Sequence, residues 1–466
     1  MNDADLRELI DDPARRREAG AVEVVEALLE RIEVCNPALN AYLAVTADLA
    51  LADARRIDEL RARGADPGPL DGMPLAIKDN IDVAGVVATA GAAVFRDRVP
   101  DRDAETVRRL RAAGAVVIGK TALHEFAYGA TTNNPHFGPC RNPWDTSRIP
   151  GGSSGGSGAA LGADLCIGAL GTDTGGSVRV PAAFNGISAL RPTYGAVSNR
   201  GVLSLCPSLD TVGAMARAIG DVARLAAVIA GYDRADPYAV EPPRREPLPP
   251  ADGSLRGLRV GLPVPFFFDE QVEPAVAANA RAAAGVLAEL GASVSEIEIE
   301  GAERAMADCA IVIRAEALAE HRERFERDPG SIGEDVRRRL ALGLDISGVE
   351  LAEAIGRMRR WRARMLAVFD AADVLLSAAT PVSAPPIESA ETIATSAQVT
   401  RLCYPWSLAG LPAVAVPCGL DGRGLPTGLQ LAAAPWRDDL ALRAGAAYQR
   451  ATAFHRLRPP ASAGAR

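Results

Sequence analysis

The spacing of apolar residues predicts helices at the start of the chain and an alternation of strands and helices after it. Over residues 1–65, apolar side chains recur at positions 22, 25, 28, 29 and 32, the spacing of one helical face. A second, Ala-rich stretch runs from 39 to 63. We therefore expect residues 1–65 to form a helical layer at the periphery of the molecule.

From residue 73 onward, short apolar runs are separated by helix-like segments. The runs are PLAI (74–77), AVVI (115–118), LCIGAL (165–170), LRVGL (258–262), SVSEIEIE (293–300), DVLLSAATP (373–381), AVAVPCG (413–419) and TGLQLAAAP (427–435), with a helical stretch at 275–291. Such alternation is typical of α/β proteins. The predicted fold is an α/β/α layered arrangement around a large mixed β-sheet, with the N-terminal helices outside it.

Residues 236–256 interrupt this alternation. Six prolines lie between Asp236 and Pro250, a density typical of an exposed, extended connector. Because strand-like runs continue on both sides of it, we expect a single domain over 1–466 with the connector inside it.

Charge and cysteine content exclude several classes of protein. A net charge of -8 provides no basic surface for a nucleic acid, so no nucleic-acid partner is expected. No apolar run reaches the ~18–20 residues that span a bilayer, and the first residues lack a signal-peptide core. We expect a cytoplasmic protein without membrane contact. The seven cysteines include no CxxC pair and the four histidines show no ligand spacing, so no metal site is expected.

Lysine is almost absent from the chain. Only Lys78 and Lys120 are lysines, and the other 49 of the 51 basic residues are arginines. A lysine can lose its proton at tolerable pH, whereas a guanidinium cannot. Lys78 follows the apolar run MPLAI, which can carry it into a desolvated interior where its pKa falls. Lys78 is therefore a candidate general base; the alternative is an ion pair with Asp79.

A Gly- and Ser-rich block at 151–186 is the most unusual segment. Its first eight residues are all Gly or Ser, but apolar residues follow at once, which argues against a flexible linker. Two nucleotide-binding patterns fit poorly. GAVVIGKT (114–121) matches the P-loop expression, yet its centre reads as a strand rather than a phosphate-binding turn. Gly156, Gly158 and Gly162 resemble a dinucleotide fingerprint with the wrong spacing.

A third pattern, G-x-S-x-G, occurs at 151–155 and 152–156 and would suit the nucleophile elbow of an α/β-hydrolase. That mechanism needs a histidine downstream, and only His321 and His455 follow in order. His455 lies in a terminal segment, and His321 lies in the charged helix EHRERFER, where we expect an exposed position. We consider this alternative the weaker one.

Several longer segments together resemble the amidase signature family. They are PLAIKDNIDVAG, VVIGKTALHEFAYG, NPWDTSRIPGGSSGGSGAA, GTDTGGSVRVPAAFNGISALRPTYG, LAGLPAVAVPCG and PTGLQLAAAPW, and the resemblance covers about residues 20 to 455. It implies hydrolysis of a small-molecule carboxamide, or of a related carbamate or urea-type C–N bond, without a cofactor or metal. By motif position it implies Ser177 as nucleophile, Ser153 as the bridging serine after a cis peptide bond, and Lys78 as base. Ser154 would take no part.

The resemblance also implies the roles of neighbouring residues. The backbone N–H groups of Thr174, Gly175, Gly176 and Ser177 would hold the oxyanion of the reacting carbonyl. Asp173 and Arg179 would mainly support the loop, although an arginine there could meet an anionic substrate. Lys120 would pack and pair beside the site. The segments around Phe126, Tyr128 and Trp406 would shape the pocket and favour an apolar acyl group.

The family also contains the A subunit of the tRNA-dependent glutamine amidotransferase, which residues 73–230 resemble closely. Two departures favour a stand-alone amidase instead. The Tyr-rich helix expected within 332–375 reads LGLDISGVELAEAIGRMRRWRARM, and SAQVTRLCYPWSLAGLP lacks an acidic residue for the amino group of glutamine. The expected partner is a small-molecule amide substrate, and a homodimer is left open.

Overall fold

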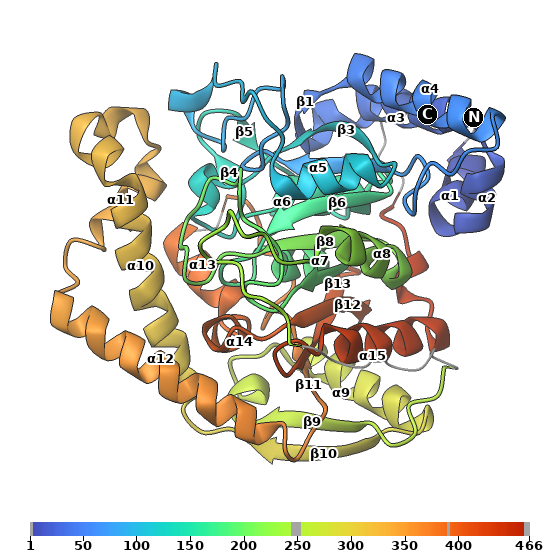
Figure 1. Ribbon diagram of the computed structural model, residues 1–466. Coiled ribbons are helices and arrows are strands. Elements are labelled where there is room, and N and C mark those ends of the chain that lie inside the picture. Colours follow the sequence, from blue (N-terminus) through green and yellow to red (C-terminus); the bar gives the residue numbers. More distant parts are fainter. Residues whose placement is uncertain (1–2, 244–252, 389–391, 461–466) are drawn as a thin grey trace.

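A computed structural model of the chain describes residues 3–243, 253–388 and 392–460 (Figure 1). Its centre is an eleven-stranded sheet. In spatial order the strands are β1 (Tyr42–Val45), β3 (Val116–Thr121), β2 (Pro74–Lys78), β6 (Gly168–Thr172), β8 (Val212–Ala216), β7 (Ser188–Arg191), β12 (Ala413–Leu420), β13 (Pro426–Ala433), β11 (Val374–Ala378), β9 (Arg259–Val264) and β10 (Ser293–Glu298). A separate two-stranded ladder joins β4 (Asn133–Asn134) and β5 (Gly138–Pro139).

The sheet is mixed, as predicted. Strands β3, β2 and β6 are parallel, and so are β11, β9 and β10, while β8, β7, β12 and β13 join these two blocks in antiparallel fashion. Because β9, β10 and β11 follow the Pro-rich segment and β2, β3 and β6 precede it, one sheet contains strands from both parts of the chain. The single-domain assignment itself stays a prediction, and residues 244–252 of the connector lie outside the described residues.

Helices cover both faces of the sheet (Figure 1). They are α1 (Asp3–Asp11), α2 (Pro13–Glu18), α3 (Ala21–Leu39), α4 (Ala47–Ala62), α5 (Glu105–Ala112), α6 (Gly155–Gly162), α7 (Arg179–Asn185), α8 (Ile219–Ile229), α9 (Pro274–Glu289), α10 (Ala302–Arg327), α11 (Glu334–Ala341), α12 (Gly348–Val368), α13 (Thr392–Thr400), α14 (Tyr404–Ala409) and α15 (Asp438–Ala451), with short 3-10 turns at 93–95, 125–127, 266–268, 329–331 and 454–456. Helices α6 and α7 pack on one face, and α8, α9 and α15 on the other. The α/β/α layering is therefore confirmed.

The N-terminal layer differs from the prediction at one place. Residues 39–63 form the strand β1 followed by α4, not one helical stretch. Helix α3 ends because Asn40 adopts a left-handed conformation (φ 50°), which asparagine tolerates better than most residues. The Asn36 side-chain amide then donates to the Tyr42 carbonyl and accepts the Tyr42 backbone N–H. Strand β1, which begins at Tyr42, pairs antiparallel with β3. The layer thus adds an edge strand to the sheet.

Apolar side chains from every part of the described chain fill the space between these layers. No helix of the described residues is both long enough and apolar enough to cross a membrane.

Candidate active site

Lys78 is the last residue of β2 and is completely buried. Its Nζ donates hydrogen bonds to Ser153 Oγ and to Thr172 Oγ1, each at 2.7 Å. Ser153 lies just before α6, and Thr172 is the last residue of β6, which runs parallel to β2. The carboxyl ends of two adjacent parallel strands therefore bring Lys78 and Thr172 together, and the segment before α6 adds the predicted bridging serine.

The charge of Lys78 is not compensated by a neighbouring carboxylate. Asp79 pairs instead with Lys120, at 2.9 Å between Lys120 Nζ and Asp79 Oδ1, and also accepts the backbone N–H of Thr89. The alternative in which Lys78 pairs with Asp79 is therefore wrong, and Lys120 pairs beside the site as expected. Burial lowers the pKa of Lys78 to about 7, opposed by the negative charges of Asp210 and Asp173. A large fraction of Lys78 is thus neutral near neutral pH.

Ser153 and Ser154 have different surroundings although they are adjacent. The Gly152–Ser153 peptide bond is cis, as the resemblance implies, and the Ser153 carbonyl accepts the His124 backbone N–H at 3.1 Å. The Ser154 hydroxyl instead bonds the backbone of Thr172, donating to its carbonyl at 3.2 Å and accepting its N–H at 3.3 Å. Ser154 is therefore held against the sheet, while Ser153 faces Lys78.

Ser177 lies in the loop between β6 and α7 and is 8% exposed. Its carbonyl accepts the Ser154 backbone N–H at 3.2 Å, which joins the two Ser-containing segments. Among the described residues its hydroxyl has no hydrogen-bond partner, so the direct Ser153–Ser177 contact of the implied relay is not present as a hydrogen bond. The hydroxyl is unengaged at the border of the buried site.

Gly176 does not fit the predicted set of oxyanion donors, because its backbone N–H is already used. Its N–H donates to Asp173 Oδ1 at 2.7 Å and is not available to a substrate. A glycine is required there by its φ of +127°. The N–H groups of Thr174, Gly175 and Ser177 have no acceptor in the described part of the chain. These three remain the candidate donors.

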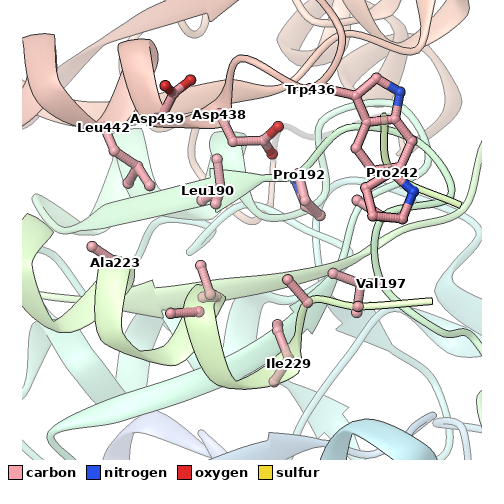
Figure 2. Close-up of a pocket in the computed structure, with 16 residues that line it drawn as sticks. Leu190, Pro192, Val197, Ala223, Ile229, Pro242, Trp436, Asp438, Asp439 and Leu442 are labelled. Carbon is pink, nitrogen blue, oxygen red and sulfur yellow. The ribbon is translucent and has the colours of Figure 1, made fainter. Parts of the chain in front are cut away.

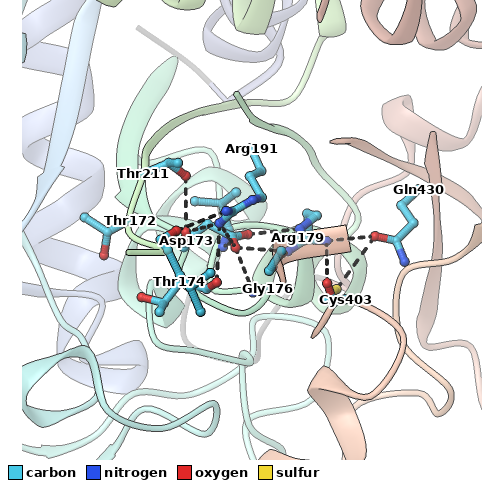
Figure 3. Close-up of polar contacts among 12 residues, drawn as sticks. Thr172, Asp173, Thr174, Gly176, Arg179, Arg191, Thr211, Cys403 and Gln430 are labelled. Atoms are coloured by element: carbon cyan, nitrogen blue, oxygen red, sulfur yellow. Dashed lines mark hydrogen bonds and ion pairs between the residues drawn. The ribbon is translucent and has the colours of Figure 1, made fainter. Parts of the chain in front are cut away.

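The loop is held by a buried charge network (Figure 3). Asp173 accepts hydrogen bonds from Arg179 Nε and Nη2 and from Arg191 Nη1, each at 3.0 Å. The remaining Arg179 donors bond the Cys403 carbonyl, Gln430 Oε1 and Ser407 Oγ. The two guanidinium groups more than offset burial and keep the pKa of Asp173 well below its usual range. Since every Arg179 donor is used, Arg179 has none left for an anionic substrate, which favours the supporting role expected for it.

Replacing Arg179 with Met should lower the free energy of unfolding by about 3 to 5 kcal/mol, because a buried carboxylate loses a bidentate partner. Denaturant unfolding followed by circular dichroism measures the change. Arg322→Met is the matched control, since Arg322 is exposed and, within the described ranges, pairs only with Glu326; its effect should stay within ~0.5 kcal/mol. A midpoint for Arg179→Met equal to that of the control would contradict the supporting role.

Sequence reasoning missed two residues of the site. Thr172 offers the second hydroxyl to Lys78, and the parallel pairing of β2 with β6 is the signal that could have found it. Asp210 lies in the loop between β7 and β8 and is buried. Its carboxylate accepts hydrogen bonds from the Thr174 hydroxyl, at 2.5 Å, and from the backbone N–H groups of Leu205 and Cys206. Asp210 thereby fixes one side of the loop that carries Ser177.

Thr172→Val should lower kcat by about 10- to 100-fold, because the Lys78 amine loses the acceptor that orients it toward Ser153. Steady-state kinetics at pH 8 measures the effect. Thr172→Ser keeps the hydroxyl and should stay close to wild type. A Thr172→Val enzyme within twofold of wild type would show that Lys78 needs no second partner.

Two residues expected to shape the pocket belong to the core instead. Phe126 is fully buried and stacks on His321 at 4.4 Å between ring centroids, and Trp406 stacks on Phe267 at the same distance. His321 is thus buried, not exposed as predicted, because its ring covers Phe126. The expected apolar acyl pocket therefore loses two of the three residues predicted to shape it.

An apolar cavity of about 450 Å³ lies elsewhere, between α8, α15 and the central strands (Figure 2). Leu190, Ala214, Ile229 and Leu442 help to line it. Side chains alternate along β8, and Gly213 faces α7, so Ala214 and this cavity are on the opposite face from the serines. Within the described ranges no group of three His, Cys, Asp or Glu side chains is placed to hold a metal ion.

Comparison with known proteins bears on this site. A family model described as Amidase matches residues 23–442. The A subunit of glutamyl-tRNA(Gln) amidotransferase from Chloroflexus aggregans is 41% identical over 467 residues, 95% of each chain. Among solved structures, one described as a vestigial protein complex that reveals the origins of an s-triazine catabolic enzyme has a TM-score of 0.87 and 34% identity, covering 96% of this chain and 97% of the other. The corresponding amidotransferase chain of Thermotoga maritima has a TM-score of 0.79 and 30% identity, covering 95% of this chain and 94% of the other.

Proposed function

The chain belongs to the amidase family of C–N hydrolases, and from this premise we propose that it hydrolyses a small-molecule amide through an acyl-enzyme on Ser177. One observation carries the proposal. Lys78 Nζ is 2.7 Å from Ser153 Oγ, buried, and free of any carboxylate partner among the described residues. A buried amine in this position can accept a proton at neutral pH.

The reaction begins with a proton relay. Neutral Lys78 takes the hydroxyl proton of Ser153, Ser153 takes that of Ser177, and the Ser177 oxygen attacks the amide carbonyl carbon. The relay requires Ser177 to turn its unengaged hydroxyl toward Ser153 when substrate binds. The N–H groups of Thr174, Gly175 and Ser177 stabilise the oxyanion that forms.

The tetrahedral intermediate collapses when the C–N bond breaks. The proton held by Lys78 returns through Ser153 to the leaving nitrogen, and the acyl group stays on Ser177 as an ester. Water, deprotonated by the same relay, then attacks the ester carbonyl and releases the acid. Protons and charges balance over the cycle, and the enzyme ends in its starting state.

A second candidate function is that of an amidotransferase A subunit, which would hydrolyse glutamine for a tRNA-dependent partner. The Chloroflexus aggregans relative favours it. One feature favours the stand-alone hydrolase: residues 392–407 contain no Asp or Glu that could bind the amino group of glutamine. Because of this missing acidic residue, we rank the stand-alone hydrolase above the amidotransferase subunit.

A hydrolysis screen of the purified single chain separates the two candidates. The substrates are aliphatic amides, anilides, carbamates, ureas and glutamine, with released ammonia or amine as the readout. We expect a substrate other than glutamine to be hydrolysed without any partner. Activity on glutamine alone, or only after partner proteins are added, would support the amidotransferase candidate.

Activity should persist after exhaustive chelation and without ATP, since the proposed base, nucleophile and oxyanion donors all belong to the chain. The measurement is the rate before and after dialysis against a chelator. A chelator-sensitive rate that returns with added metal would contradict the proposed site.

A further inference from the structure

The cavity on the face of the sheet away from the serines arises from small side chains on α8. Ala223, Ala226 and Ala227 recur at helical spacing in VARLAAVIAG (222–231), and all three line it. Because alanine fills little of the space toward α15, a cavity of about 450 Å³ remains between the two helices (Figure 2). This volume is within the range of pockets that bind small molecules, roughly 300–1,000 Å³.

The walls of the cavity are mostly apolar, and its mouth is open to solvent. Leu190 of β7 and Ala214 of β8 are almost completely buried beneath it. Ala227 and Pro242 also line it and are exposed, so a small molecule can enter from outside. Apolar cavities of this kind favour a hydrophobic occupant over water. A hydrophobic group that enters here therefore leaves water for apolar surroundings.

The carboxylate of Asp438, the first residue of α15, lies among these apolar side chains. In Figure 2 it is directed toward Pro192 and Trp436, inside the ring of lining residues. Thr193 holds it there, donating its backbone N–H to Asp438 Oδ1 at 2.9 Å and its hydroxyl to Oδ2 at 2.6 Å. The position of this carboxylate is therefore fixed before any ligand binds.

Trp436 is held at the same place by the same threonine. Its backbone N–H donates to the Thr193 hydroxyl oxygen at 2.7 Å. Its φ of +67° is a left-handed conformation that bulky residues rarely adopt. Such strain persists only where the surroundings enforce it, and it gathers at sites that bind ligands. Asp438 and Trp436 thus form a rigid rim on the cavity.

The charge of Asp438 has no cationic partner within the described ranges. Its neighbour Arg437 pairs instead with Asp439, at 3.1 Å. A carboxylate offers about four acceptor positions, and the two hydrogen bonds from Thr193 leave some of them free. The N-terminus of α15 supplies only a partial positive charge. Burial raises the pKa of Asp438, as expected for a carboxylate that lacks a counter-charge.

We propose that this cavity binds a small organic cation that carries an ammonium group on an apolar body. The ammonium donates charge-assisted hydrogen bonds to Asp438, and the apolar body packs against α8 and the floor formed by Leu190 and Ala214. Since the cavity and the serines lie on opposite faces of the sheet, this inference goes beyond the proposed function and does not depend on it.

Three probes of matched shape test the proposal: cyclohexylmethylammonium, cyclohexylmethanol and cyclohexanecarboxylate, each titrated into the wild-type protein by isothermal calorimetry. The ammonium should bind at least ~10-fold more tightly than the alcohol, because only the ammonium compensates the charge of Asp438, and the carboxylate should not bind. Labelling Ser177 with a fluorophosphonate should leave the affinity for the ammonium unchanged, which distinguishes this cavity from the candidate active site.

Two pairs of variants locate the bound cation. Asp438→Asn removes the charge and should bring the affinities for ammonium and alcohol within ~3-fold of each other. Asp439→Asn is its control, since that carboxylate is paired with Arg437, and should keep the wild-type preference. Ala223→Phe fills the cavity and should abolish binding of both probes. Ala319→Phe, at an exposed position of α10 outside the cavity, should bind as wild type.

Equal affinities for the ammonium and the alcohol in wild type, or no binding of the ammonium, would overturn the proposal whether or not the variants fold. Binding of the ammonium that survives Ala223→Phe in a folded protein, or that is lost once Ser177 is labelled, would also overturn it. If Ala223→Phe does not fold, the comparison of Asp438→Asn with Asp439→Asn locates the cation. If Ser177 cannot be labelled, the proposed function fails while the other measurements still decide on the cavity.

Discussion

Ser177→Ala should abolish hydrolysis, with a loss in kcat of about 10⁴-fold or more, because the acyl group then has no oxygen to which it can bind. The adduct left by a fluorophosphonate on the wild-type protein, mapped by mass spectrometry, should be on Ser177. The variant should not be labelled.

Ser154→Ala is the matched control for Ser177→Ala. In the described part of the chain, the Ser154 hydroxyl bonds only the backbone of Thr172, so its loss should cost about 1 kcal/mol of stability and leave most of kcat. An adduct on Ser153 or Ser154 would instead favour the nucleophile-elbow alternative.

Lys78→Arg should be as inactive as Lys78→Ala, with a loss of about 10²- to 10⁴-fold, because a guanidinium stays protonated at any pH that the protein tolerates. A merely electrostatic role would let arginine preserve part of the rate. A Lys78→Arg enzyme with more than about a tenth of wild-type kcat would contradict the role of Lys78 as base.

The pH profile gives a second test of Lys78. The active form is neutral, and the pKa of Lys78 is lowered to about 7, so wild-type kcat/KM should rise with pH through about 7 and level off above 8. The direction follows from the neutral form, which increases as pH rises. A rate that falls between pH 6 and 8 would exclude a lysine base.

The pairing of Lys78 with Ser153 could be predicted because both belong to long, specific motifs, and because a nearly lysine-free chain made Lys78 conspicuous. The main strands could be predicted from short apolar runs. Strands β7 and β8 could not, since SALR and VGAMA are short, rich in small residues and without alternation.

The missed features of the site depend on contacts across the fold. The hydrogen bond from Gly176 to Asp173 arises from the shape of a single loop turn, which composition does not encode. Phe126 and Trp406 occur within family-like segments, but each finds an aromatic partner from a distant helix or turn, His321 and Phe267, and packs in the core. The location of these two side chains is therefore determined by ring stacking in the folded protein and not by the motif in which they occur.

The burial of Lys78 and Lys120 has a practical consequence. The folded protein presents no lysine amine to solvent, because the two that exist are completely enclosed by the sheet and its helices. Amine-directed crosslinkers and acylating reagents therefore find no lysine side chain on its surface. A lysine-specific endoprotease can cleave only when the sheet opens, so the appearance of its fragments measures how often the central strands separate.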